Sequence, residues 1–388
     1  MESITRFFNP SSERSVTFIV GATAITTAAL VSLIQCASQG TQPKIIKSPT
    51  ATLLPSLSDS EAQALPYPPD ALPGGRNVNS PYGVARVYEW GPEGGRKVLL
   101  IHGITTPCIA LGAVAHGLVE NGCRVMLMDL WGRGYSDSCA DLQHDDRLYS
   151  TEILLAVTSS SLSWIGGPDG GFSIVGYSLG GGIAAAFTSY FPQMVKSLVL
   201  MAPAGLIRPV HMSGSSKLLY STGFVPERLL QWSVRKRLQT PLYANENKKT
   251  DVRDAATAEV EGGAEFSFQD APLSKTRPDL TVVAAVRWQL RAHQGFVHSF
   301  MSSIRYAPIV GQHESWRRLG LRDDKTLIFA GTTDPIIYVE ELRDDAEATV
   351  GKDKIEYRVI EGAHDFPITN ADEIVGIVCD FWGIQPRA

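Results

Sequence analysis

The sequence predicts an α/β protein built on a mostly parallel, doubly wound sheet, and two observations carry this prediction. Short and mostly apolar runs, such as Val98–Ile101 and Phe172–Val175, alternate along the chain with segments of helical character. Such runs are typical of parallel strands that helices cover on both faces. The chain of 388 residues, with 44% hydrophobic and 19% charged residues, is also large and apolar enough to bury a sizeable core.

The expected elements follow in chain order. Residues Ala85–Trp90 alternate in the manner of a half-buried strand. The further expected strands are Val98–Ile101, Arg124–Asp129, Phe172–Val175, Ser197–Met201, Thr326–Ala330 and Ile355–Ile360. The expected helices are about Ala110–Asn121, Leu148–Ile165, Ile183–Tyr190, Val339–Ala346 and Ala371–Trp382. Together they predict one core in two parts, residues 81–205 and 320–388.

Between residues 206 and 319 this alternation stops. The stretch contains helix-like pieces over Glu227–Leu238, Leu280–Arg291 and Phe296–Ile304. An insertion after the strand that ends at Met201 would lie above the carboxyl ends of the strands, where open parallel sheets bind ligands. We therefore expect residues 206–319 to form a helical lid that shapes a substrate pocket and excludes water. The alternative is an insertion with no part in catalysis.

The first eighty residues are expected to lie outside this core. After a tail over residues 1–14, residues 15–37 carry no charge, and such a run can cross a hydrocarbon layer of roughly 30 Å. This predicts a single-pass transmembrane anchor, whose orientation the flanking charges do not decide. The alternative is a secreted protein whose signal peptide is cleaved near Ala37 or Ser38. Residues 38–80 are rich in Pro, Ser and Thr and predict a stalk.

Charge and composition exclude several classes of function. A net charge of −5 without a basic stripe does not fit a nucleic-acid-binding protein. Five scattered cysteines indicate neither a disulfide framework nor a zinc site, although one disulfide between Cys108 and Cys139 stays open. The run Gly180–Gly182 begins a helix without the spacing of a phosphate-binding loop. We therefore expect no metal and no organic cofactor.

One motif indicates a nucleophile. The sequence Gly176-Tyr177-Ser178-Leu179-Gly180 stands between an expected apolar strand and an expected helix of small residues. A strand, a sharp turn and a helix are the context in which a serine side chain is exposed as a nucleophile. The two glycines permit the turn, because a side chain at either position would collide with the neighbouring strand or helix.

The serine needs a base, and the base needs an acid that orients it. His364 follows the last expected strand, and Asp334 follows the strand before it. Both would therefore lie at the same sheet edge as Ser178, in the chain order Ser, Asp, His. Asp365 competes as the acid, and Asp323 and Asp324 are disfavoured because they precede their strand.

With these residues the chain resembles the α/β-hydrolase fold superfamily of serine hydrolases, from about Pro81 to Phe381, with the region around Leu206–Leu319 matched in position only. Val98–Gly103 resembles the strand of that family that ends in His-Gly, and Asp129–Asp137 resembles the loop after the next strand in esterase-like and C–C bond hydrolase-like members. The resemblance implies that the backbone N–H groups of Ile104 and Leu179 form an oxyanion hole. The helix dipole at Leu179 favours negative charge there.

Other residues have plainer interpretations. His102 is expected to be a structural hydrogen-bonding residue, and Asp129 and Asp137 are expected to shape their loop. Cys108 and Cys139 lack a base that would make them reactive. Aromatic residues of the expected lid either line an apolar acyl pocket or pack the lid, and His298 could touch substrate; these aromatics are Trp288, Phe296 and Phe300.

The function expected from these residues is that of a membrane-anchored serine hydrolase with a small, apolar acyl substrate. The scissile bond would be a carboxylic ester, a lactone or a thioester. One alternative uses the same triad for C–C bond hydrolysis or a lyase reaction. Another is a binding protein without catalysis on a hydrolase scaffold.

Overall fold

The computed structural model describes residues 23–31, 43–166, 170–208, 227–239 and 277–385. The chain divides into two units, Met1–Lys44 and Ile45–Ala388. In the first unit, residues 23–31 form a helix. No helix among the described residues is both long and apolar enough to cross a bilayer. They therefore do not support the transmembrane anchor expected over residues 15–37, most of which lies outside the described part of the chain.

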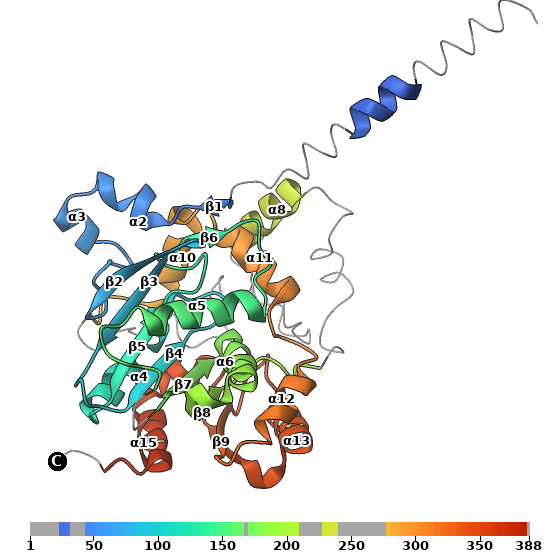
Figure 1. The fold of residues 1–388 in the computed structure, drawn as a ribbon. Coiled ribbons are helices and arrows are strands. Elements are labelled where there is room, and N and C mark those ends of the chain that lie inside the picture. The colour runs from blue at the N-terminus through green and yellow to red at the C-terminus, as the bar shows by residue number, and fades with distance from the viewer. Residues whose placement is uncertain (1–22, 32–42, 167–169, 209–226, 240–276, 386–388) are drawn as a thin grey trace, which may run out of the picture. The chain divides into compact units, whose positions relative to one another are not determined.

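Eight strands form one sheet in the second unit (Figure 1), in the order β10-β9-β8-β7-β4-β5-β3-β2. The strands are β2 (Gly75–Ser80), β3 (Gly83–Trp90), β4 (Lys97–Ile101), β5 (Arg124–Met128), β7 (Phe172–Tyr177), β8 (Val195–Met201), β9 (Thr326–Gly331) and β10 (Ile355–Ile360). Strand β3 runs antiparallel to its neighbours β2 and β5, and the other neighbouring strands run parallel. The prediction of a mostly parallel α/β sheet is confirmed.

The parallel strands end at a common edge of the sheet. Tyr177 at the end of β7 is paired with Met201 at the end of β8. Gly331 at the end of β9 is paired with Ile360 at the end of β10. Strands β7 and β9 are buried at every position, so this register is held by apolar packing on both faces. The loops after β7, β9 and β10 therefore leave the sheet at the same edge.

Helices cover both faces of the sheet, as a doubly wound fold requires. The chain moves one way along the sheet from β4 to β5 and the opposite way from β7 through β8 and β9 to β10. Because the crossover connections are right-handed, connections that run in opposite directions place their helices on opposite faces of the sheet. On one face, α4 (Gly112–Glu120) packs against α15 (Ala371–Trp382). On the other face, α6 (Leu179–Tyr190) contacts α5 and α12, and α12 contacts α13 (Figure 1). Their bounds are α5 (Asp146–Thr158), α12 (His313–Leu319) and α13 (Val339–Val350), and the short helices are η2 (Cys108–Leu111), η3 (Pro192–Met194), η5 (Lys352–Lys354) and α14 (Phe366–Thr369).

Three further helices lie in the stretch expected as a lid. They are α8 (Glu227–Gln239), α10 (Val282–Ala292) and α11 (Phe296–Tyr306), and α8 contacts both of the others. Thr281 caps α10 by accepting a hydrogen bond from the Ala284 amide. Residues 209–226 and 240–276 of this stretch lie outside the described part of the chain. The lid boundaries stay a prediction.

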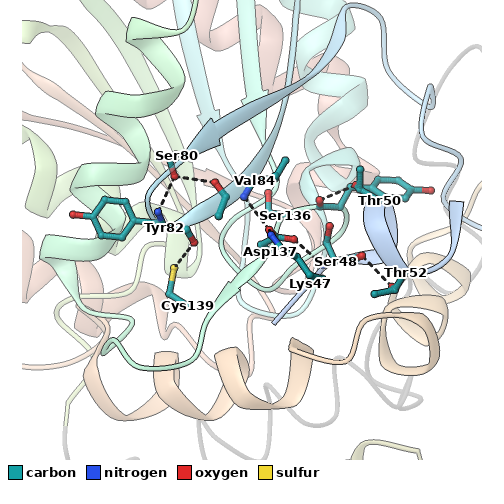
Figure 2. Close-up of polar contacts among 12 residues, drawn as sticks. Lys47, Ser48, Thr50, Thr52, Ser80, Tyr82, Val84, Ser136, Asp137 and Cys139 are labelled. Atoms are coloured by element: carbon teal, nitrogen blue, oxygen red, sulfur yellow. Dashed lines mark hydrogen bonds and ion pairs between the residues drawn. The ribbon is translucent and has the colours of Figure 1, made fainter. Parts of the chain in front are cut away.

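The stalk expected over residues 38–80 is wrong for residues 45–80, which belong to the folded unit. β1 (Ile45–Ile46) pairs with β6 (Ser138–Cys139), and α2 (Pro49–Thr52), η1 (Leu54–Ser56) and α3 (Asp59–Gln63) lead toward β2. Figure 2 shows Lys47 and Ser48 bound to the Asp137 carboxylate, at 2.9 and 2.8 Å. Tyr67 and Leu72 are buried in the core. The proline content was misleading, because proline also suits the first turn of a helix, as Pro49 shows.

The structure also decides a possible disulfide and the bounds of one predicted helix. Cys108, Cys123, Cys139 and Cys379 are free and buried, so the disulfide left open between Cys108 and Cys139 does not form. The helix expected over Leu148–Ile165 is α5, which begins two residues earlier and ends at Thr158. It begins there because the Asp145 carboxylate accepts hydrogen bonds from the first free amides of the helix.

Candidate active site

Ser178 lies in the turn between β7 and α6, with φ 53° and ψ −118°. A residue with a side chain rarely adopts a positive φ, and the strain requires a tightly fixed surrounding. The backbone holds the turn, since Ser178 N donates to the Met201 carbonyl at 2.9 Å and the Ser178 carbonyl accepts from Ala204 N at 2.9 Å. The serine side chain is thereby presented at the carboxyl edge of the sheet.

The two glycines of the motif are required by close backbone contacts. A Cβ at position 176 would lie 2.3 Å from the carbonyl oxygen of Gly180. A Cβ at position 180 would lie 2.1 Å from the carbonyl oxygen of Ile101 at the end of β4. Both distances are far below van der Waals contact, so the reason proposed from the sequence for these glycines is confirmed.

The structure brings Ser178, His364 and Asp334 into one hydrogen-bonded row. His364 Nε2 lies 2.9 Å from Ser178 Oγ, and His364 Nδ1 lies 2.7 Å from Asp334 Oδ2. The histidine and the aspartate are buried, and the serine is partly exposed. An imidazole that donates from Nδ1 to a carboxylate leaves Nε2 free to accept the serine proton. The arrangement can therefore deprotonate the hydroxyl.

The other carboxylate oxygen of Asp334 is also fully used. Asp334 Oδ1 accepts hydrogen bonds from the amides of Ile336 and Ile337 at 2.8 and 2.9 Å. These two contacts fix the rotation of the carboxylate, so that Oδ2 faces the histidine. Asp365, the competing acid, does not take this place, because His364 Nδ1 is bonded to Asp334.

Two backbone amides are expected to bind an oxyanion, and each belongs to a residue next in sequence to one that lies at this row, Ser178 for Leu179 and Gly103 for Ile104. Leu179 is the first residue of α6, and an N–H at that position has no acceptor within its own helix. Ile104 is buried in the bend that follows β4, and β4 is the strand beside β7. Their role as an oxyanion hole stays a prediction.

His102 is a structural residue, as expected. Its Nδ1 donates to the Gly103 carbonyl at 2.7 Å, and its Nε2 accepts from the Leu130 amide at 2.9 Å. The pKa of His102 is lowered to about 3, chiefly because the ring is completely buried; the bond to Gly103 opposes this shift, and the nearby Arg133 adds to it. The neutral ring therefore ties the loop after β4 to the loop after β5.

The loop residues Asp129 and Asp137 also have the shaping role expected of them. Asp129 is buried and accepts hydrogen bonds from the amides of Cys108 and Tyr135 at 2.9 and 3.0 Å. Asp137 accepts from the Val84 amide at 3.0 Å (Figure 2). Burial raises the pKa of the Cys108 thiol well above its usual value, and the Asp129 charge adds to this. This thiol is therefore not a nucleophile.

The aromatic residues of the insertion pack against neighbouring side chains. Phe296 and Phe300 are fully buried and stack with ring centroids 6.2 Å apart. The Trp288 ring meets Tyr67 and Tyr135 at centroid distances of 5.8 and 5.2 Å. These contacts favour the packing interpretation over an acyl pocket lined by the three residues. The partner Tyr67 comes from the segment that composition had assigned to a stalk.

Sequence reasoning missed two buried side chains that contact the loop after β4. Arg133 donates from Nε to the Ile104 carbonyl, and Gln289 donates from Nε2 to the Thr105 carbonyl, both at 2.9 Å. Arg133 was noted only as part of a loop motif. Gln289 had no signal, because a single glutamine on a helix is normally a surface residue.

Comparison with known proteins decides the family. The signature of the α/β hydrolase fold matches residues 97–371. The chain belongs to this family. It is 31% identical over 128 residues to a serine hydrolase-like protein from Danio rerio, which covers 33% of this chain and 37% of the relative. It is 32% identical over 118 residues to Lipase LipV from Mycobacterium tuberculosis, covering 30% and 41%.

The alignments therefore span well under two thirds of these relatives. A solved structure of a putative lipase from Acinetobacter baumannii superimposes with a TM-score of 0.54 and 19% identity. The match covers 80% of this chain and 93% of that one. At this identity the likeness is one of fold. Family membership and the lipase relative together support a hydrolase.

Proposed function

We propose that this member of the α/β hydrolase family is a serine hydrolase that cleaves a carboxylic ester, a lactone or a thioester. The observation that carries the proposal is the row in which His364 bridges Ser178 Oγ and Asp334 Oδ2, at 2.9 and 2.7 Å. Both distances are within hydrogen-bond reach of a nucleophile and base pair with its orienting acid. Chance packing of three such groups, each at the end of its own strand, is a poor explanation.

In the proposed reaction, Ser178 Oγ attacks the substrate carbonyl carbon while His364 Nε2 takes the hydroxyl proton. Asp334 holds the imidazole in the Nδ1–H tautomer and stabilises the imidazolium ion that forms. The tetrahedral intermediate collapses as His364 returns the proton to the leaving alcohol or thiol, and an acyl-enzyme remains. Water then attacks the acyl-enzyme by the same proton path, and the acid is released.

The negative charge of the intermediate would lie between the N–H groups of Ile104 and Leu179. Preorganised donors of this kind stabilise a transition state by about 3 kcal/mol each. At Leu179 the positive end of the α6 dipole adds to the attraction. No side-chain charge is needed in this role.

An apolar substrate group is favoured by the surface beside Asp334. A recess there is lined mostly by apolar side chains, and the rim carries Arg208 and Glu341. Ile336 and Ile337, whose amides hold the Asp334 carboxylate, also line this recess. The recess is small, about 20 Å³, so a methyl-sized group seated in it would lie beside the hydrogen-bonded row.

A fluorophosphonate probe tests the proposal directly. We expect covalent labelling at Ser178 in the full chain, and loss of labelling in Ser178→Ala. Ser163→Ala is the matched control, since Ser163 is an exposed serine whose hydroxyl donates to the nearby Ile165 carbonyl. Folded protein that does not label would contradict the proposal and favour a binding protein on a hydrolase scaffold.

A panel of p-nitrophenyl esters with rising acyl length then defines the substrate class. Turnover that rises with chain length would support an apolar acyl substrate. A labelled protein that is silent across the panel would direct attention to lactones or to C–C bond hydrolysis.

We also propose that residues 15–37 anchor the protein in a membrane, on the ground of their charge-free sequence alone. The full chain should then sediment with membranes and resist extraction at alkaline pH. Introducing charges by Ile25→Arg and Leu30→Arg should release it. A mature N-terminus near residue 38 would instead establish signal cleavage.

A further inference from the structure

The loop after β4 is held by an unusual set of side-chain contacts. Three successive backbone carbonyl oxygens each accept a hydrogen bond from a buried side chain. The pairs are Gly103 with His102 Nδ1 at 2.7 Å, Ile104 with Arg133 Nε at 2.9 Å, and Thr105 with Gln289 Nε2 at 2.9 Å. Because the peptide unit is planar, fixing the Gly103 carbonyl also fixes the direction of the Ile104 N–H. The contacts to the Ile104 and Thr105 carbonyls hold the two peptide units that follow and so fix the position of the loop.

Gln289 differs from the other two donors because it comes from α10 in the insertion. Its side chain is fully buried. Its Nε2 donates to the Thr105 carbonyl at 2.9 Å, and its Oε1 accepts from the Gly134 amide at 2.8 Å. Only one orientation of the amide satisfies both partners, so the side chain is locked between two core loops. A helix residue 184 positions from Thr105 in sequence thus helps to determine where the loop lies.

Arg133 reinforces this link through the neighbouring helix. Its guanidinium is fully buried, and Nη2 donates to Ser303 Oγ on α11 at 3.0 Å. The Tyr149 hydroxyl lies 2.7 Å from the same serine oxygen. The Phe296 ring of α11 lies 5.7 Å from the guanidinium carbon. The side of the loop that carries the Ile104 carbonyl is therefore held by α11.

We propose that Gln289 is a positioning residue, which transmits the packing of α10 to the Ile104 N–H and so sets the strength of the oxyanion hole. This inference rests on the proposed function. It assigns the insertion a role in transition-state stabilisation that is separate from shaping a substrate pocket. The amide acts through Thr105 and Gly134 and does not itself touch the substrate.

The test compares the rate constant of fluorophosphonate labelling in variants of the full chain. The probe places a phosphonyl oxygen where the oxyanion of an ester intermediate would lie, so the rate constant reports on the hole without knowledge of the natural substrate. Gln289→Met keeps the side-chain length and removes both hydrogen bonds. We expect its second-order rate constant to fall by roughly 10-fold, less than the loss caused by deleting an oxyanion donor outright.

A purely structural role predicts a different result. Destabilisation would lower the labelled fraction at completion, whereas the rate constant of the folded fraction would stay that of the wild type. Gln289→Glu gives a second signature, because a neutral carboxyl can donate to Thr105 and accept from Gly134. Its rate constant should approach the wild-type value at low pH and fall, relative to wild type, as the carboxyl ionises. Arg287→Ala, on the exposed side of α10, is the matched control and should match the wild type.

The outcomes separate this inference from the proposed function. If the wild type labels but Gln289→Met labels with an unchanged rate constant, the positioning role is wrong and the triad proposal stands. If folded wild-type protein does not label at all, the proposed function fails and the inference fails with it. A slowed Gln289→Met together with a pH-dependent Gln289→Glu supports the inference.

Discussion

Replacing Asp334 by asparagine tests the catalytic row through the hydrogen bonds of a single carboxylate. Asp334 Oδ1 accepts from the amides of Ile336 and Ile337, so the oxygen of an asparagine must occupy that place. The reverse orientation would set an NH₂ group against two N–H donors and leave all of them unpaired. The asparagine NH₂ must therefore face His364 Nδ1, where the carboxylate oxygen now lies at 2.7 Å.

This orientation forces the wrong tautomer on the histidine. Nδ1 must then accept, the ring proton moves to Nε2, and Nε2 can no longer take the proton of Ser178. The corresponding substitution in a characterised serine protease lowers kcat by about 10⁴-fold, which is about 5.4 kcal/mol at 1.36 kcal/mol per factor of ten. We expect a loss of this order. Stability should change little, because the amide oxygen keeps both backbone hydrogen bonds.

The assay is the fluorophosphonate labelling rate, or ester turnover once a substrate is known, with a thermal melt of the same samples. Asp324→Asn is the matched control. Asp324 lies before β9 and makes a 3.5 Å contact with Arg322, so its replacement should leave the rate unchanged. An Asp334→Asn protein that keeps more than a tenth of the wild-type rate would refute the tautomer argument.

Two further predictions concern stability. Gly180→Ala should abolish activity and lower the melting temperature, because its Cβ would lie 2.1 Å from the Ile101 carbonyl oxygen. Gly376→Ala lies in exposed open space on α15 and should stabilise the fold by about 0.5–1 kcal/mol in urea unfolding. Equal effects of the two substitutions on stability would contradict the geometry. Burial lowers the pKa of His102 to about 3 and of His293 to about 4. Below about pH 6.5 the unfolded chain therefore binds more protons than the folded chain. As the pH falls from there to the folded-state pKa, each histidine should lower the free energy of unfolding by about 1.4 kcal/mol per pH unit. His293→Asn should flatten this acid slope, and an unchanged slope would show that another group causes it.

The fold and the meeting of Ser178, His364 and Asp334 could be predicted because their signals are local. A buried parallel strand is recognisable as a short apolar run, and β4, β5, β7, β8, β9 and β10 were all expected at nearly their true bounds. Once parallel strands are known, the residues just past their carboxyl ends must share an edge. Ser178, Asp334 and His364 each occupy such a position, which made their meeting predictable before any distance was known.

The prediction of a stalk was wrong because it rested on composition, which does not describe how side chains pack. Residues 45–80 contain many prolines, and the pattern was interpreted as a stalk. The structure shows a segment whose few apolar side chains find matching partners: Tyr67 is buried against Tyr135 and Trp288, and its hydroxyl donates to Asp129 at 3.1 Å. The composition of a segment does not show which single apolar side chains find such partners.

The sequence by itself determined the parallel strands and most of the helices between them, the nucleophile motif and the candidates for its base and acid, because each depends on a few neighbouring residues. Only the tertiary structure decided that Gln289 spans Thr105 and Gly134, and that Arg133 joins Ile104 to Ser303. These contacts link residues up to 184 positions apart, as between Gln289 and Thr105. They arise from how α10 and α11 pack on the core, and no sequence spacing encodes a hydrogen bond between two elements until that packing is known.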